Sequence, residues 1–122
     1  MPKGLISAAM AQPSPIVHQP PAALEQALIR LGQNIRTARL RRSWRMADLA
    51  KRMGVTRFTV ADVEKGKPGT SVATYLGALW ALGLLEQISA VADPDQDSVG
   101  KALQAARAPQ VARRVARLDD NF

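Results

Sequence analysis

The sequence predicts an all-α protein, and three observations support this. Apolar residues make up 47% of the 122 residues, and they are mostly Ala, Leu, Val and Ile with only two Trp, one Tyr and two Phe. They recur at helical rather than strand spacing. Two short helical segments, 46–53 and 57–65, flank a tight turn. We expect a five-helix domain over residues 23–92, between a disordered arm (1–22) and a C-terminal extension of one helix and a basic tail (93–122).

The arm is rich in proline among small and polar residues, a composition typical of flexible segments. A helix is expected from residue 22 to about Arg42. Gly32 interrupts this helix and is expected to weaken it. Its apolar stripe has a spacing of three and four residues, and comprises Leu24, Leu28, Leu31, Ile35 and Ala38.

The central pair of helices has clear start and stop signals. The first runs from Met46 to Met53, and Gly54 can adopt the left-handed conformation that ends it. Thr56 is a good N-cap for the second, which ends at Gly66. The residues expected to face inward are Leu49, Ala50, Met53, Val60 and Val63, and Trp44 and Val55 are expected to pack on the helices that follow them.

Three further helices complete the prediction. Ser71 caps a helix over Val72–Leu82, whose apolar face is expected to hold Leu76, Leu79 and Trp80. A short helix follows over Leu84–Val91. The run Asp93-Pro94-Asp95 is typical of a helix start, so a last helix is expected to reach about Arg107.

Charge and composition favour a nucleic-acid partner over an enzyme. Residues 23–92 have eleven Lys/Arg and five Asp/Glu, which leaves a net charge of +6, and basic charge on a compact domain is typical of phosphate binding. The chain has no Cys, and its one His, His18, lies in the arm. No acid pair, phosphate-binding loop or metal-ligand cluster stands out, so we expect no catalytic residue, cofactor or metal. We expect a cytoplasmic protein without a membrane segment, because the apolar run 72–85 is short and interrupted.

The spacing of the central helices is suited to the major groove of DNA, which admits an α-helix. Val60 and Val63 would bury the back of the second helix. Arg57, Phe58, Thr59 and Asp62 would then face outward.

The sequence resembles the Xre/Cro and lambda-repressor-like helix-turn-helix family over residues 31–92. The matching segments are 31–36, 48–50, 54–56, Val60, 63–66 and 71–74. This resemblance implies that Arg57, Phe58 and Asp62 contact bases, that Thr56 and Thr59 contact phosphate or sugar, and that Arg45, Met46, Lys65 and Lys67 approach the DNA backbone. It also implies a partly buried salt bridge between Arg39 and Glu64.

Several of these roles have plain structural alternatives. Arg57 either contacts guanine or phosphate or is simply solvated, and Phe58 either contacts a thymine methyl group or is buried. Asp62 either accepts a hydrogen bond from cytosine or pairs with Arg57 or Lys65. Lys65 and Lys67 contact phosphate or are solvated. Arg45 and Met46 depart from the family, which often has a serine cap and a glutamine there.

A narrower resemblance concerns the segments 81–85, 92–95 and 99–100, which look like HipB-type antitoxins. It implies a HipA-type kinase toxin as partner. Leu84, Leu85 and Ile88 are candidates for a dimer or partner contact, with burial in the core as the alternative. The leading hypothesis is a homodimeric repressor that binds a palindromic operator in double-stranded DNA and represses its own operon. The alternatives are a stand-alone regulator, or an interaction protein that neutralises a partner enzyme with little DNA binding.

Overall fold

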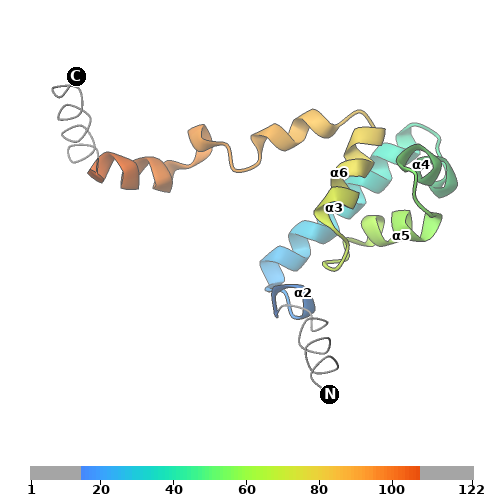
Figure 1. Cartoon of the computed structure of the whole chain (residues 1–122), viewed down its shortest axis with the longest axis horizontal. Helices are drawn as coiled ribbons and strands as arrows, with labels where there is room; N and C mark the ends of the chain where they lie inside the picture. Colours follow the sequence, from blue (N-terminus) through green and yellow to red (C-terminus); the bar gives the residue numbers. More distant parts are fainter. Residues whose placement is uncertain (1–14, 108–122) are drawn as a thin grey trace, which may run out of the picture. The chain divides into compact units, whose positions relative to one another are not determined.

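The computed structural model describes residues 15–107, and every element in this range is helical (Figure 1). The prediction of an all-α protein is therefore confirmed. The expectations for residues 1–14 and for the basic tail beyond residue 107 lie outside the described residues. The elements are α2 (Pro15–His18), α3 (Ala22–Arg41), α4 (Met46–Met53), α5 (Arg57–Lys65), α6 (Val72–Ala81), the 3₁₀ helices η1 (Leu85–Ala90) and η2 (Pro94–Gln96), and a helix over residues 98–107.

The core lies in the first of two compact units, which ends at Leu85. Here α5 packs against α3, α4 and α6, and α4 also packs against α6. Its largest fully buried side chains are Ile35, Leu49, Val60 and Val63. Each buried side chain of this size stabilises the fold by about 1.5–3 kcal/mol. Because α5 meets all three other helices, its position is fixed from several sides.

Capping residues fix the end of α4, both ends of α5 and the start of α6 as predicted. The Thr56 and Ser71 hydroxyls each accept a hydrogen bond from the backbone N–H three residues on, at 3.3 and 3.2 Å. Gly54 and Gly66 end α4 and α5 with φ angles of 74° and 72°. This conformation is left-handed and favours glycine, which lacks the Cβ that makes it costly.

Gly32 has a role that differs from the expected one. A Cβ built on Gly32 would lie 2.6 Å from the carbonyl oxygens of Val63 and Glu64. The glycine therefore allows α3 to approach the backbone of α5. Helix propensity predicts that Gly32 weakens α3. The packing of α3 against α5 nevertheless requires a residue without a Cβ at this position.

Arg42 joins the C-terminal ends of two helices. Its guanidinium donates to the carbonyl oxygen of Ala38 at 2.8 Å and to that of Leu82 at 2.9 Å. The Ala38 carbonyl lies near the end of α3, and Leu82 is the C-cap residue of α6. The next residue, Ser43, turns the chain away with a φ of 58°.

Replacing Ser43 by glycine is expected to raise the free energy of unfolding by about 0.5–1 kcal/mol. The gain comes from removing a Cβ from a left-handed residue, and it is reduced by the greater freedom of glycine in the unfolded chain. Urea denaturation followed by circular dichroism measures it. The Ser43→Ala variant is the control, since alanine keeps the Cβ. If the Ser43→Gly and Ser43→Ala variants are equally stable, the backbone at Ser43 is not strained.

The face of α6 differs from the prediction at one position. Trp80 was expected on the buried face, yet 63% of its surface is exposed. Leu79 is buried as predicted, and the helix also buries Tyr75 and Ala78. Trp80 follows Leu79 directly, so its side chain leaves the helix about 100° further round.

The C-terminal unit begins at Glu86 and also differs from the prediction. The expected helix over Leu84–Val91 is the 3₁₀ helix η1, and all of residues 86–90 are exposed. The continuous helix expected from Asp93 is wrong, because η2 ends at Gln96 and a separate helix covers residues 98–107. Asp97 starts this helix by accepting a hydrogen bond from the Gly100 N–H at 2.8 Å. Segments this short gain little from α-helical hydrogen bonds unless packing holds them.

Candidate nucleic-acid interface

The first turn of α5 projects from the domain. Val60 and Val63 are fully buried behind it. In front of it, Arg57 is exposed and Phe58 has 70% of its surface exposed, so the alternative of a buried Phe58 is wrong. The guanidinium carbon of Arg57 lies 5.3 Å from the centre of the Phe58 ring. An arginine and an apolar ring are thus presented together at the start of the helix.

The two threonines of this turn hold the helix start. The Thr56 hydroxyl accepts from the Thr59 N–H, and the two hydroxyl oxygens lie 3.3 Å apart. Thr56 is exposed and Thr59 is half-buried. The Thr56 hydroxyl thus satisfies a backbone donor at the end of the helix where such groups have no helical partner.

Asp62 is neutralised by a different cation from those expected. Its carboxylate lies 2.9 Å from Nζ of Lys67, and neither Arg57 nor Lys65 is its partner. Lys67 is held in turn by the Tyr75 hydroxyl, which donates to its carbonyl oxygen at 2.8 Å. Burial raises the pKa of Tyr75, and the negative charge of Asp62 raises it further. The hydroxyl therefore keeps the proton that this bond requires. Lys65 is exposed.

The start of α4 is capped from inside the helix. Arginine has no acceptor atom, so Arg45 cannot cap with its own side chain. Asp48 instead accepts from the Arg45 N–H at 2.7 Å, and its carboxylate lies 3.6 Å from the Arg45 Nε. The hydrogen bond from this backbone N–H holds the pKa of Asp48 below its ordinary value. Met46 is half-buried and packs against the core, whereas the Arg45 side chain is exposed.

Arg39 and Glu64 form a bidentate, buried pair between α3 and the last turn of α5. Nε and Nη2 of Arg39 donate to the two carboxylate oxygens of Glu64 at 2.6 and 2.9 Å. Nη1 donates to the carbonyl oxygen of Trp44 at 2.8 Å. The hydrogen bond to Glu64 raises the pKa of Arg39, while burial acts in the opposite direction. This pair fixes the end of α5 that lies away from Arg57.

Two contacts near this surface are absent from the sequence-based prediction. One is the Asp62–Lys67 pair, which spans the end of α5. The other is the stacking of Arg52 on Trp44, with the guanidinium carbon 4.0 Å from the ring centre. Both involve residues from different turns or elements. A helical pattern within one segment gives no signal for either of them.

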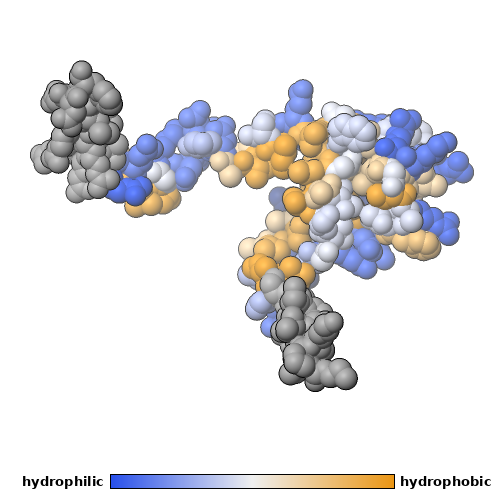
Figure 2. All heavy atoms as spheres, viewed as in Figure 1, coloured by the Kyte–Doolittle hydropathy of each residue, from blue (hydrophilic) through white to orange (hydrophobic). Residues whose placement is uncertain are grey.

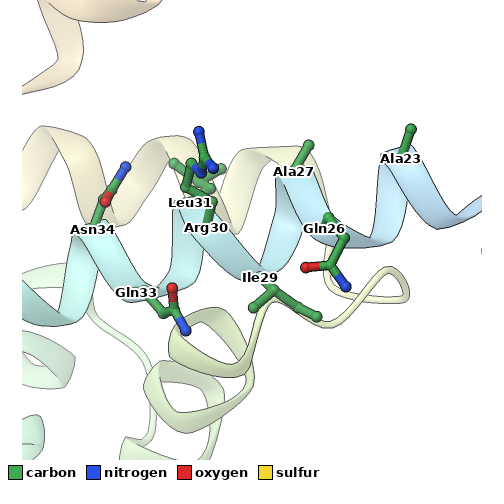
Figure 3. A pocket seen from close by; sticks show the side chains of 8 residues that line it. All are labelled: Ala23, Gln26, Ala27, Ile29, Arg30, Leu31, Gln33 and Asn34. Carbon is green, nitrogen blue, oxygen red and sulfur yellow. The ribbon is translucent and has the colours of Figure 1, made fainter.

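A separate groove follows the first half of α3 (Figure 3). Figure 3 shows that its eight side chains leave this one helix on two sides. They include Gln26, Arg30, Gln33 and Asn34 but no acid and no histidine. Within residues 15–107, no three His, Cys, Asp or Glu residues are grouped as metal ligands. The exposed turn of α5 is therefore the better candidate for a functional site.

The comparison with protein families bears on the same segment. Residues 35–76 match the family model described as Helix-turn-helix. This segment is similar to helix-turn-helix domains. It extends from α3 through α4 and α5 into α6. Neither the curated proteins nor the solved structures give a match to this chain.

The match indicates a DNA-binding transcriptional regulator. Within the described part of the chain, no helix has the length and apolar content that a membrane crossing needs. Of the residues expected at a dimer or partner contact, Leu84 and Leu85 are half-buried and Ile88 is exposed, and Leu84 packs against the core.

Proposed function

We propose that the protein is a homodimeric transcriptional repressor that binds an operator in double-stranded DNA through α5. The observation behind this proposal is the exposed first turn of α5, with Arg57 and Phe58 in front of a buried back face. Arg45, Thr56, Thr59, Asp62, Lys65 and Lys67 are proposed to flank this contact. Met46 packs on the core and is proposed to position the start of α4 rather than to donate a hydrogen bond.

Replacing Arg57 by alanine is expected to weaken operator binding by about 1–3 kcal/mol, because a bidentate arginine–guanine contact is lost. The probe is the DNA upstream of the protein's own gene, compared with a shuffled duplex by fluorescence anisotropy at two salt concentrations. The Arg57→Lys variant separates the two possible contacts. It should lose selectivity if Arg57 binds guanine, and keep most of its affinity if Arg57 binds phosphate.

The absence of a selective, salt-sensitive shift for the wild-type protein on its own upstream DNA would contradict autoregulation. Circular dichroism checks that each variant is folded. Arg57 is exposed and lies outside the core, so its replacement is not expected to change stability.

A dimer would present two copies of α5 to half-sites about 34 Å apart, which is one turn of B-DNA. The sequence of α6 contains no charged residue, and its exposed side includes Val72 and Trp80. An apolar face on a protein with a net charge of +7 offers two copies a surface free of charge repulsion. Sedimentation equilibrium of the wild type and of the Trp80→Glu variant tests whether Trp80 contributes to such a contact. Leu84, Leu85 and Ile88 are proposed as further dimer contacts.

A second proposed function is that of an antitoxin, whose partner would be a HipA-type kinase toxin. The resemblance over 81–85 and 92–95 supports it, and so does the exposed Trp80, which could contact another protein. Co-purification with the product of an adjacent kinase-like gene tests this proposal. If the Arg57→Ala variant loses operator binding but still binds that partner, the two functions are separate. If the wild type binds the partner but no DNA, the protein is an interaction protein only.

A further inference from the structure

Arg57 and Phe58 form a contact that has no role in the fold. Phe58 has 70% of its surface exposed, so it adds little to the core. Its ring lies 5.3 Å from the Arg57 guanidinium carbon. Figure 2 shows hydrophilic and apolar surface side by side where α5 begins. The exposed ring and the arginine beside it together offer an apolar and a charged group to a ligand at the start of α5.

The donors of Arg57 remain available to such a ligand. Within residues 15–107, the Arg57 side chain is in no hydrogen bond or ion pair with the protein. The nearest acid on the same helix, Asp62, is engaged by Lys67. The ring of Phe58 restricts the guanidinium to the space beside it through a cation–π contact. Arg57 is thus directed outward and its charge is not neutralised.

The chemistry of the two side chains selects two different base pairs. Arginine donates two hydrogen bonds to O6 and N7 of guanine in the major groove, and an apolar ring contacts the C5-methyl group of thymine. Successive base pairs rise by about 3.4 Å, so pairs two steps apart are about 7 Å apart. The guanidinium and the ring lie 5.3 Å apart, which is between one and two of these steps. The two side chains can therefore reach base pairs that are adjacent or two steps apart.

We propose that the first turn of α5 recognises a guanine and a thymine that lie one or two base-pair steps apart. Arg57 binds the guanine and Phe58 covers the methyl group of the thymine. This inference rests on the proposed function, and it specifies part of the operator half-site. It also predicts that 5-methylcytosine replaces thymine at this position, because both bases present a methyl group at C5.

The experiment begins with selection of duplexes bound by the wild-type protein from a random pool. We expect a guanine within two base-pair steps of a thymine in each half-site. Deoxyuridine is then placed at that thymine, which removes only the methyl group. The affinity of the wild type should fall about fourfold, the equivalent of one buried methylene. The Phe58→Ala variant should bind the thymine and deoxyuridine duplexes equally.

A second arm replaces the thymine–adenine pair by cytosine–guanine, with or without a C5-methyl group. The wild type should prefer the methylated duplex about fourfold, and the Phe58→Ala variant should not. The Arg57→Ala variant should lose the preference for guanine, by about 5- to 150-fold. Thermal melting checks that both variants keep the wild-type fold.

The outcomes separate this inference from the proposed function. If the selection returns no preferred sequence, the proposed function fails. If the wild type binds selectively but deoxyuridine has no effect on its affinity, or has the same effect on Phe58→Ala, the assignment of Phe58 to a methyl group is wrong while DNA binding stands. A guanine preference retained by Arg57→Ala would overturn the assignment of Arg57.

Discussion

Replacing Arg39 by methionine is expected to lower the free energy of unfolding by about 3–5 kcal/mol. Glu64 is buried and accepts two hydrogen bonds from Arg39. Without them its carboxylate is left in the core with no partner, and this cost exceeds that of losing an exposed ion pair. The carbonyl oxygen of Trp44 also loses its donor. Small domains are stable by about 5–15 kcal/mol, so a measurable unfolded population is expected near 37 °C.

Urea denaturation followed by circular dichroism at 222 nm measures this change. The matched control is Arg36→Met, because Arg36 lies on the same helix but is exposed, and its replacement should cost less than about 0.5 kcal/mol. The double variant Arg39→Met, Glu64→Leu removes both charges and should recover a large part of the loss. If Arg39→Met is as stable as Arg36→Met, the Arg39–Glu64 pair does not have the role expected of it.

Replacing Gly32 by alanine is expected to destabilise the domain by up to about 2 kcal/mol. The new Cβ would lie 2.6 Å from two backbone carbonyl oxygens of α5, at Val63 and Glu64. Backbone atoms cannot turn aside as a flexible side chain can, so α3 and α5 must separate and their contacts loosen. Overpacking of this kind costs about 1–3 kcal/mol and occasionally more. The better helix propensity of alanine offsets about 1 kcal/mol of that cost.

Gly77 provides a control with the same chemical change. It lies inside α6, and a Cβ there would meet only the Cε atom of Met53 at 3.7 Å, an ordinary contact. Gly77→Ala should therefore stabilise the domain by about 0.5–1 kcal/mol. Thermal melts of both variants test whether the two substitutions change the stability in opposite directions. If Gly32→Ala is also stabilising, the close approach of α3 to α5 is wrong.

The parts of the fold that could be predicted depend on local physics. The caps at Thr56 and Ser71 and the left-handed glycines at 54 and 66 involve residues within one or two turns, so a short window of sequence contains all the relevant atoms. The buried faces of α4 and α5 follow from the spacing of apolar residues. The partner of Arg39 came from a family resemblance, because no local pattern joins residues 39 and 64.

The parts that could not be predicted depend on contacts between elements. Helix propensity assigns Gly32 a cost, yet the backbone of another helix makes it necessary. Apolar character alone placed Trp80 in the core, although the turn of α6 directs it outward. Asp62 has three cations nearby in sequence, and only the path of the chain after Gly66 decides that Lys67 is its partner. The roles of the DNA-facing residues remain predictions for the same reason, since they depend on a second molecule.

The two ends of α5 are subject to different constraints. The C-terminal end is fixed by Glu64, by the close approach of Gly32 and by Gly66, whereas Arg57 and Phe58 at the other end are exposed. Under the proposed function, substitutions at these two positions would alter what the helix recognises with little effect on folding. New operator specificities would then be accessible by single replacements there, without compensating changes elsewhere in the domain.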